Sequence, residues 1–192
     1  SGEAKCRADI SLPGRQTELL AELKKQGRKV VLVVMAGRQL TIGKEVEMAD
    51  AVLYQFHGGT MAGPALADVI WGKAVPSGRM PVTMPKMVGQ VPMYYNHKNT
   101  GRPAQDIVMM DDIEPGAPQF SLGATSYHLD AGSEPLFPFG FGLSYTTFKY
   151  GPVSLSSGKL AMTADTLTVS CDVTNTGSVD AYETPQLYVR DL

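Results

Sequence analysis

The sequence is poor in cysteine and lacks any long hydrophobic run, and each shortage excludes a kind of protein. Only two cysteines occur, Cys6 and Cys171, near opposite ends of the chain and without the paired spacing of a zinc site. We therefore expect no zinc, while a disulfide between them stays open. The longest apolar stretch, residues 30–36, is far shorter than the roughly 20 residues that cross a bilayer. We expect no membrane span.

The chain also lacks an excess of charge of either sign. Its 17 Lys and Arg residues against 19 Asp and Glu residues give a formal net charge of −2. Since such a protein has no basic surface to hold phosphates at physiological salt, we expect no nucleic-acid partner. Neither an initiator Met nor a secretion signal is present at the start. We expect residue 1 to be an interior position of a longer chain.

What the first half does contain is an alternation of helix and strand patterns. Ser11 is expected to cap a helix with Pro13 in its first turn, and Gly27 is expected to end it. Two apolar runs, residues 29–36 and 51–56, are typical of strands covered on both faces. Short helices are expected over residues 41–49 and 63–71, the latter with Trp71 packed. This order predicts a parallel, doubly wound α/β sheet.

The second half has a different pattern. A short strand is expected over residues 80–84, and residues 86–135 are expected to be mostly ordered loop, because prolines interrupt them. Residues 167–173 and 186–189 alternate strictly between apolar and polar side chains, which is typical of an antiparallel β-sandwich. Only three or four strands precede the last residue, fewer than the seven of a complete sandwich. The 192 residues therefore predict one domain or pieces of two.

Familiar catalytic motifs are absent, including the serine nucleophile elbow, the phosphate-binding loop and the zinc-protease motif. We expect no cofactor and no metal. His57-Gly58-Gly59 follows the second predicted strand and indicates a tight turn against a neighbouring helix. Several carboxylates are expected on solvated helix faces, namely Glu18, Glu22, Glu45 and Glu47. Glu3 differs, because it lies in a loop before the first helix, where a doubly wound sheet presents ligand-facing groups.

Several long stretches resemble one enzyme family. They are Ser1-Gly2-Glu3, ADISLPGRQ at residues 8–16, AGPALADVIWG at 62–72, PSGRMPVTMP at 76–85, VGQVPMYYNHKNTGRP at 88–103 and LFPFGFGLSYTTF at 136–148. In this order they closely resemble the second domain of family 3 glycoside hydrolases, the bacterial β-glucosidase and β-xylosidase group. The similarity covers nearly the whole chain.

The resemblance implies a three-part enzyme, with an N-terminal (β/α)8 barrel, an α/β sandwich and a fibronectin type III-like β-sandwich. Residues 1–148 would then be the C-terminal part of the doubly wound α/β sandwich with its long connecting loop. Residues 149–192 would be the start of the fibronectin type III-like domain. The barrel, which lies outside this sequence, would be the partner that carries an Asp nucleophile.

In the resembled family, hydrolysis retains the anomeric configuration, and Glu3 matches a Gly-Glu position that commonly supplies the acid/base. Retention needs two carboxyls about 5 Å apart, one attacking the anomeric carbon while the other shuttles the proton. The resemblance therefore implies an exo-acting β-glycosidase that releases terminal non-reducing β-D-glucosyl residues from β-linked oligosaccharides or glycosides. Without the nucleophile, the chain alone is expected to be inactive. The resemblance also implies a periplasmic or extracellular location.

Two alternatives from other functional classes stay open. The chain could be a non-catalytic carbohydrate-binding module that presents aromatic side chains to a sugar, the candidates being Trp71, Tyr94, Tyr95 and Tyr127. It could also be a protein-interaction module, because an unfinished β-sandwich leaves strand edges that pair with another chain.

Overall fold

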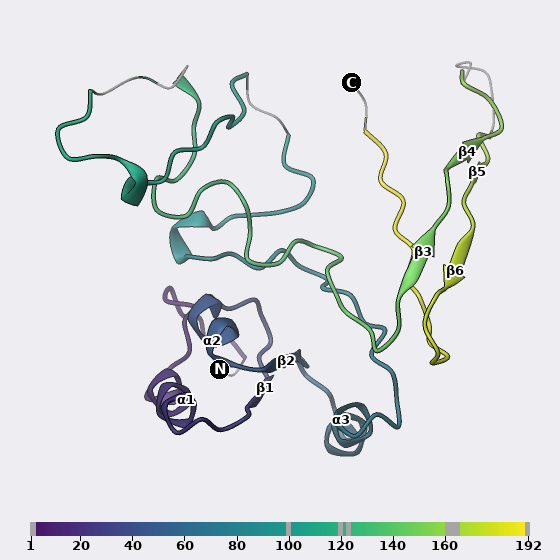
Figure 1. The fold of residues 1–192 in the computed structure, drawn as a ribbon, viewed down its shortest axis with the longest axis horizontal. Coiled ribbons are helices and arrows are strands. Elements are labelled where there is room, and N and C mark those ends of the chain that lie inside the picture. Colours follow the sequence, from purple (N-terminus) through teal and green to yellow (C-terminus); the bar gives the residue numbers. More distant parts are fainter. Residues whose placement is uncertain (1–2, 99–100, 119–120, 122–123, 160–165, 191–192) are drawn as a thin grey trace. The chain divides into compact units, whose positions relative to one another are not determined.

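The structure, a computed structural model, describes residues 3–98, 101–118, 121, 124–159 and 166–190. The chain forms two compact units. The first comprises Ser1–Ala62 and Met80–Phe141, and the second comprises Gly63–Arg79 and Gly142–Leu192. Short helices and strands are joined by long irregular segments (Figure 1). Within the described ranges, no helix is both long and apolar enough to cross a membrane.

Helix α1 (Gln16–Lys25) begins later than the sequence predicts. Gly14 has a φ of +67°, a left-handed conformation that interrupts a helix, and Arg15 takes the N-cap position without a side-chain bond. The expected cap is therefore wrong. Instead, the backbone N–H of Ser11 donates to Oδ1 of Asp9 at 2.9 Å, which stabilises a turn ahead of the helix.

The predicted end of α1 is confirmed. Gly27 also has a φ of +67°, and its N–H donates to the carbonyl of Lys24 at 2.9 Å. The N–H of Arg28 donates to the carbonyl of Leu23 at 3.2 Å. These two bonds form a Schellman motif, which satisfies carbonyls at the end of the helix and favours glycine at the left-handed position.

Strands β1 (Val31–Val34) and β2 (Ala51–Tyr54) pair in parallel, as the sequence predicts. Their burial is less even than expected for strands covered on both faces. Val34 is 4% exposed, whereas Val31 at the other end of β1 is 49% exposed. Burial is concentrated at the carboxyl end of the strand, where the core of this unit lies. Its buried apolar residues are Ile10, Val34, Leu40, Ile42 and Met84.

Helix α2 (Gly43–Met48) precedes β2 and lies beside α1 (Figure 1). Thr17 on α1 donates a hydrogen bond to the carboxylate of Glu45 on α2. Glu45 is only 5% exposed, so its expected place on a solvated face is wrong. The hydroxyl partner compensates part of the cost of burying a carboxylate, and it joins the two helices.

Residues 80–84 run antiparallel to residues 137–141 without forming a continuous strand. Met80 donates to the carbonyl of Phe141 and Met84 donates to that of Phe137, both at 2.8 Å. Only the pair of Met84 and Phe137 forms a regular bridge. Pro81 has no N–H to donate, and this gap explains why the expected strand is wrong.

The predicted long loop is confirmed for the described residues of 86–135. Its described part includes the short 3-10 helices η1 (Val88–Gln90) and η2 (Met110–Asp112). The buried side chain of Gln90 accepts the N–H of Lys86 at 2.7 Å and donates to the carbonyl of Glu134 at 3.3 Å. Such bonds order a loop that has little regular structure.

In the second unit, helix α3 (Ala62–Ile70) begins with the last residue of the first unit and has no buried residue. The hydroxyl of Tyr145 donates to the carbonyl of Val69 at 2.8 Å. Trp71, which follows the helix, is 79% exposed, so its expected packing is wrong. Helical spacing identifies an apolar side of α3 but not a partner that covers it.

The rest of this unit is an interrupted antiparallel ladder. Strand β3 (Phe148–Tyr150) pairs with β6 (Val173–Asn175), and β4 (Ser154–Leu155) pairs with β5 (Val169–Ser170). The antiparallel pairing expected of the region is confirmed. The ladder breaks beside Pro152, which has no N–H to donate, and the predicted strand over 167–173 is correspondingly divided.

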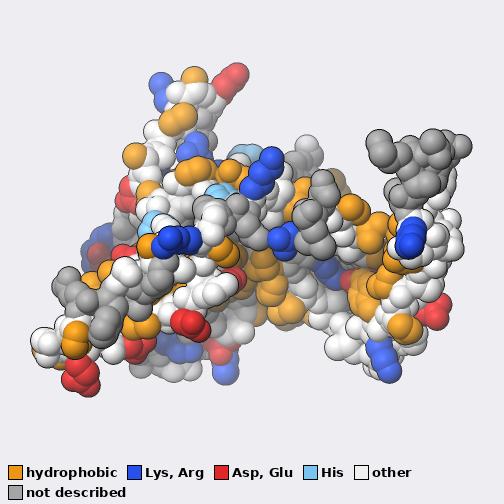
Figure 2. Space-filling model, turned by 90° about the horizontal axis from the view of Figure 1, so that it is seen from above, with side chains coloured by type: hydrophobic (Ala, Val, Ile, Leu, Met, Phe, Trp, Pro, Cys, Tyr) orange, Lys and Arg blue, Asp and Glu red, His pale blue; other side chains and the backbone are white. Residues whose placement is uncertain are grey.

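Residues 186–189 form no strand, contrary to the alternation of their side chains. Leu187 is 68% exposed and Val189 is 90% exposed. Figure 2 shows hydrophobic side chains, in orange, at the surface of the face it presents. Alternation indicates which side chains a strand would bury, but a strand forms only when a neighbouring strand accepts its hydrogen bonds.

Candidate functional site

A cavity of about 460 Å3 lies in the first unit, lined by residues 32–38 along and after β1 and by His57 after β2. Because the strands are parallel, their carboxyl ends share the edge at which open α/β sheets bind ligands. The volume falls within the range of about 300–1,000 Å3 that small-molecule sites occupy. Most of its lining is apolar, and its polar lining residues are Arg7, Asp9, Gln16, Arg38 and His57. We call this space the edge cavity.

One wall of the edge cavity is the loop before α1. Hydrogen bonds from Ser11, with a smaller contribution from the nearby Arg7 guanidinium, hold the pKa of Asp9 below its ordinary value. Arg7 Nη1 donates to the carbonyl of Ser11 at 3.2 Å, while its Nη2 lies 3.9 Å from Asp9 Oδ2. The carbonyl of Ile10 accepts the N–H of Thr41 at 3.0 Å. The loop thus places an ionised carboxylate and a guanidinium at the cavity.

A second guanidinium comes from Arg38, which follows β1. Its Nη1 donates weakly to the carbonyl of Arg7 at 3.5 Å, and its own carbonyl accepts the hydroxyl of Tyr54 on β2. Burial raises the pKa of Tyr54 to about 12, so the phenol remains a donor throughout the neutral range. Arg7 and Arg38 also line an adjoining cavity of about 440 Å3. The two arginines therefore border both spaces.

His57 reaches the edge cavity from the turn after β2. Phe56 before it has a φ of +55°, which is rare for a bulky side chain. A Cβ at Gly37 would lie 2.5 Å from His57 Nε2, so glycine at that position lets the imidazole lie against the end of β1. A Cβ at Gly58 would lie 2.6 Å from that of Ala62, the first residue of α3. The predicted close approach to a neighbouring helix is confirmed at Gly58, while residues 57–59 themselves form no regular turn.

Sequence reasoning assigned no functional role to Arg7, Asp9, Arg38 or His57. A signal existed for two of them, because Arg38 and His57 closely follow runs that the sequence identifies as parallel strands. Arg7 and Asp9 carry no comparable signal. They reach the cavity because the loop before α1 folds back onto residues after β1, which is a tertiary contact.

Glu3, the predicted acid/base, lies in an exposed turn ahead of the loop that lines the cavity. Ala4 follows with a φ of +58°, an uncommon conformation for a residue that has a Cβ. The Glu3 side chain is not among those that line the edge cavity. Its role in catalysis stays a prediction, since that role requires a second carboxylate from another part of the protein.

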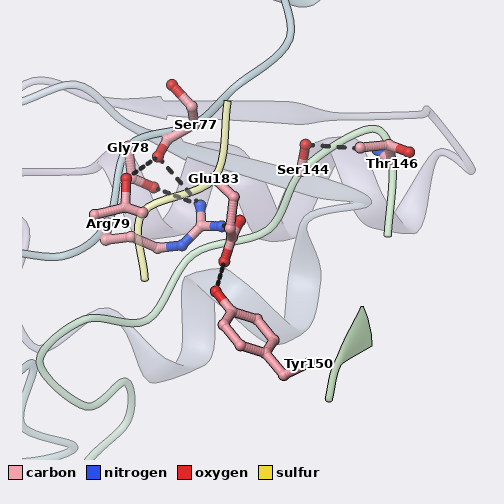
Figure 3. A network of polar contacts seen from close by, with 8 residues as sticks. Ser77, Gly78, Arg79, Ser144, Thr146, Tyr150 and Glu183 are labelled. Carbon is pink, nitrogen blue, oxygen red and sulfur yellow. Dashed lines mark hydrogen bonds and ion pairs between the residues drawn. The ribbon is translucent and has the colours of Figure 1, made fainter. Parts of the chain in front are cut away.

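The second unit contains a different polar cluster, shown in Figure 3. Arg79 Nη2 and Glu183 Oε2 lie 2.6 Å apart, and their side chains are 13% and 15% exposed. Tyr150 on β3 donates to Glu183 Oε1 at 2.7 Å, a bond that raises the pKa of Tyr150. Arg79 Nη1 also donates to the carbonyls of Ser77 and Gly78. We call this arrangement the Arg79–Glu183 clamp. It has a structural role, because it joins residues 77–79, strand β3 and the segment around Glu183, which are distant in the sequence.

The aromatic residues proposed for sugar binding differ in accessibility. Tyr94 is 50% exposed, Tyr95 is 60% exposed and Trp71, in the other unit, is 79% exposed. The hydroxyl of Tyr127, by contrast, bonds to the N–H and the carbonyl of Val108 at 3.0 and 3.2 Å. Tyr127 therefore has a structural role in the loop.

The cysteines do not form a disulfide. Cys6 and Cys171 are both free and exposed. Among the residues that the structure describes, no group of three or more His, Cys, Asp or Glu side chains is arranged to hold a metal ion. The chemistry available at the edge cavity is therefore that of its two guanidiniums, its carboxylate, its amide and its imidazole.

Comparison with known proteins supplies information that the geometry does not. Residues 1–145 match the family model described as "Glycosyl hydrolase family 3 C-terminal domain". A curated relative from Salmonella typhimurium, "Periplasmic beta-glucosidase", is 41% identical over 190 residues, which are 99% of this chain and 23% of that protein. "Beta-xylosidase" from Formosa agariphila is 42% identical over 190 residues, 99% of this chain and 24% of that protein. The chain spans about a quarter of the length of these relatives.

Solved structures agree with the sequence comparison. A β-glucosidase from Erythrobacter marinus aligns with a TM-score of 0.72 and 33% identity, over 92% of this chain and 20% of that one. A β-glucosidase from Listeria innocua in complex with gluconolactone aligns with a TM-score of 0.66 and 36% identity, over 81% of this chain and 20% of that one. The described fold is similar to a corresponding portion of these larger proteins.

Proposed function

This chain belongs to the family of glycosyl hydrolase family 3 C-terminal domains, and from that membership we propose that it is part of a retaining, exo-acting β-glycosidase. The reaction is hydrolysis of a terminal non-reducing β-D-glucosyl residue from an oligosaccharide or glycoside. The observation that carries the proposal is the family match over residues 1–145, supported by relatives that align with 99% of the chain.

The preference for glucose rests on the names of the similar proteins. The Salmonella relative and the similar solved structures are β-glucosidases, whereas the Formosa relative is a β-xylosidase. We therefore propose glucosides as the substrate class and treat xylosides as the alternative for the assays below.

We propose Glu3 as the acid/base and an Asp on a separate (β/α)8 barrel as the nucleophile. In a retaining mechanism the nucleophile attacks the anomeric carbon while the acid protonates the leaving oxygen, and the same residue then deprotonates a water molecule. The exposure of Glu3 on a loop supports this role, because its carboxylate is accessible to a substrate bound by another domain. The partial coverage of the relatives is consistent with a barrel elsewhere in the protein.

The domain arrangement and the location belong to the same proposal. Residues 1–148 would form part of a doubly wound α/β sandwich, which the parallel pairing of β1 and β2 supports. Residues 149–192 would begin a fibronectin type III-like β-sandwich, which the antiparallel pairs β3–β6 and β4–β5 support. A periplasmic or extracellular location is proposed because a relative is named a periplasmic enzyme.

The first experiment uses the chain alone with p-nitrophenyl β-D-glucoside and the corresponding β-D-xyloside. We expect no release of nitrophenol above the spontaneous rate, because covalent catalysis and most sugar contacts would lie on the barrel. Robust turnover by the chain alone would refute the proposal that the nucleophile lies elsewhere. Faster hydrolysis of the xyloside by the complete protein would overturn the glucosidase assignment.

The second experiment replaces Glu3 by Gln in the complete protein. A positioned acid contributes about 100- to 10,000-fold, so hydrolysis of cellobiose should fall by that factor. A dinitrophenyl glucoside should suffer much less in the first step, because its leaving group departs without a proton. The matched control is Glu114→Gln, an exposed carboxylate that should leave both rates unchanged. Equal, small effects of Glu3→Gln on both substrates would exclude Glu3 as the acid and would favour the binding-module alternative.

A further inference from the structure

The backbone of β1 is paired on one side. The carbonyl of Val30 accepts the N–H of Ala51 at 3.3 Å, and the carbonyl of Val34 accepts the N–H of Gln55 at 2.9 Å. In a parallel ladder, the backbone groups of alternate residues face the neighbouring strand. The even-numbered residues of β1 therefore face β2, and among the described residues these two strands make up the whole sheet.

The odd-numbered residues face the other way. In the part of the chain that the structure describes, no residue bonds to the backbone N–H or carbonyl of Val31, Val33 or Met35. Val31 and Met35 are also 49% and 64% exposed. Backbone groups of this kind need hydrogen-bond partners once they are removed from water. Val31, Val33 and Met35 thus form an unpaired edge, which we call the β1 edge.

The sequence of this strand lacks the features that protect an edge from other chains. Residues 30–36 are VVLVVMA, without a charged residue, a proline or a glycine. Edge strands that face water carry lysine, proline or a bulge, because an exposed apolar edge is a template for pairing. Parallel strands, moreover, are normally covered on both faces. The composition of β1 is therefore that of an interior strand of a sheet.

The edge cavity lies along the β1 edge, because its lining includes the consecutive residues 32–38. Side chains of consecutive strand residues point to opposite faces, so a space that touches all of them lies beside the strand and not over one face. Neither of the two cavities described above is lined by a residue of β2. The space therefore identifies β1 as the strand at which the sheet continues.

The occupant that fits this space is another extended segment of polypeptide. A neighbouring strand lies about 4.7–4.9 Å away and presents N–H and carbonyl groups in the same alternating row as the β1 edge. The comparisons indicate where such a segment comes from, since the chain spans 23% and 24% of the length of two relatives. About three quarters of a protein of that length lies outside these residues.

We propose that a strand from the part of the complete protein outside residues 1–192 pairs with the β1 edge and fills the edge cavity. Its backbone bonds to Val31, Val33 and Met35, and its apolar side chains cover these residues. The inference rests on the proposal that the chain is part of a larger enzyme. It adds which strand continues the sheet and which residues make the contact, and it assigns the edge cavity to a structural element.

The first test is hydrogen exchange in the complete protein, resolved to single amides by mass spectrometry. The amides of Val33 and Met35 should exchange as slowly as those of Leu32 and Val34, within about tenfold after correction for intrinsic rates, because both pairs belong to ladders. Leu32 and Val34 are the matched control, since they face β2. Exchange of Val33 and Met35 at least about a hundredfold faster than the control would refute the proposal.

The second test identifies the occupant by photo-crosslinking. A diazirine amino acid at position 35 of the complete protein should, on irradiation, join a segment of the same polypeptide outside residues 1–192. The matched control carries the same amino acid at position 19, because Leu19 on α1 is 62% exposed and lies outside both cavities. It should not join that segment. Crosslinked dimers through position 35 would show that a second copy pairs there, and products of water alone would show a free edge; either result overturns the proposal.

These outcomes separate the pairing from the glycosidase proposal, because neither test measures turnover. Slow exchange along the β1 edge in a protein that is inactive toward β-glucosides would support the pairing and refute the reaction. Fast exchange along the β1 edge in an active enzyme would refute the pairing and leave the tests of Glu3 unaffected.

Discussion

Replacing Arg79 by Met tests whether the Arg79–Glu183 clamp stabilises the second unit. The change removes the guanidinium that lies 2.6 Å from Glu183 and donates to two backbone carbonyls, and it retains most of the apolar stem. The carboxylate of Glu183 then keeps the hydrogen bond from the hydroxyl of Tyr150 but loses the guanidinium. We expect the variant to be folded but clearly less stable.

The expected magnitude follows from burial. Breaking a buried pair by removing one partner costs about 3–5 kcal/mol, whereas exposed pairs contribute about 0.2–1 kcal/mol. The side chains of Arg79 and Glu183 are 13% and 15% exposed, so both are largely shielded from water but not completely buried. We therefore expect Arg79→Met to lower the free energy of unfolding by about 2–4 kcal/mol.

The chain offers a matched control for this change. Arg15 Nε and Glu18 Oε2 are also 2.6 Å apart, but their side chains are 88% and 62% exposed. Arg15→Met should therefore cost less than about 1 kcal/mol. Comparing the two variants isolates the effect of burial at the same separation of charged atoms.

The assay is urea unfolding followed by circular dichroism. With a slope of about 1–3 kcal/mol per molar urea, a loss of about 3 kcal/mol moves the midpoint by about 1–3 M. The double variant with Glu183→Gln should lose less than the sum of the single losses, because both changes remove the same interaction. Equal costs for Arg79→Met and Arg15→Met would refute the reasoning.

Two further predictions concern single groups. The pKa of Tyr54 is raised to about 12, above its ordinary value of 10.0, so the stability that its neutral phenol contributes should be complete below about pH 10 and be lost as pH rises toward about 12. In urea unfolding at a series of pH values, Tyr54→Phe should therefore lose less stability at alkaline pH than the original chain. An equal alkaline loss of stability in both proteins would count against the raised pKa. Gly142→Ala should destabilise the protein by about 1–3 kcal/mol, because its Cβ would lie 2.5 Å from the carbonyl oxygen of Gly78. In Gly63→Ala, on α3, the added Cβ would meet no atom within 4 Å, so this change should stabilise the protein by about 0.5–1 kcal/mol. Thermal unfolding measures both changes. Equal effects of the two glycine replacements would contradict the packing around Gly142.

Local patterns predicted the elements whose causes are local. The end of α1 follows from Gly27, which alone can take the left-handed conformation without a Cβ penalty, and the apolar runs at 29–36 and 51–56 contain β1 and β2. The predicted start of α1 was wrong, because Ser11 and Pro13 favour a helix that the left-handed conformation of Gly14 interrupts. A sequence pattern identifies candidate positions at which a helix can begin, but the backbone conformation of the intervening residues decides at which position the helix does begin.

Patterns failed where an outcome depended on a partner distant in sequence. The alternation over residues 186–189 predicts a strand, yet no strand forms, since a strand requires a neighbour for its hydrogen bonds. Glu45 has the spacing of a solvated residue but is buried, because Thr17 on another helix donates to it. Trp71 has the spacing of a packed residue but is exposed.

The sequence by itself determined the family and the two segments that form the parallel strands, since both are recognised from residues that are contiguous along the chain. Only the tertiary structure decided which side chains share the edge cavity. Helix α1 and strand β1 separate Arg7 and Asp9 from Arg38 and His57 in the sequence. The four residues line one space because the parallel strands β1 and β2 end at a common edge and the loop before α1 folds back onto that edge. Proximity of that kind is set by chain folding and by burial of the core, and no spacing in the sequence encodes it.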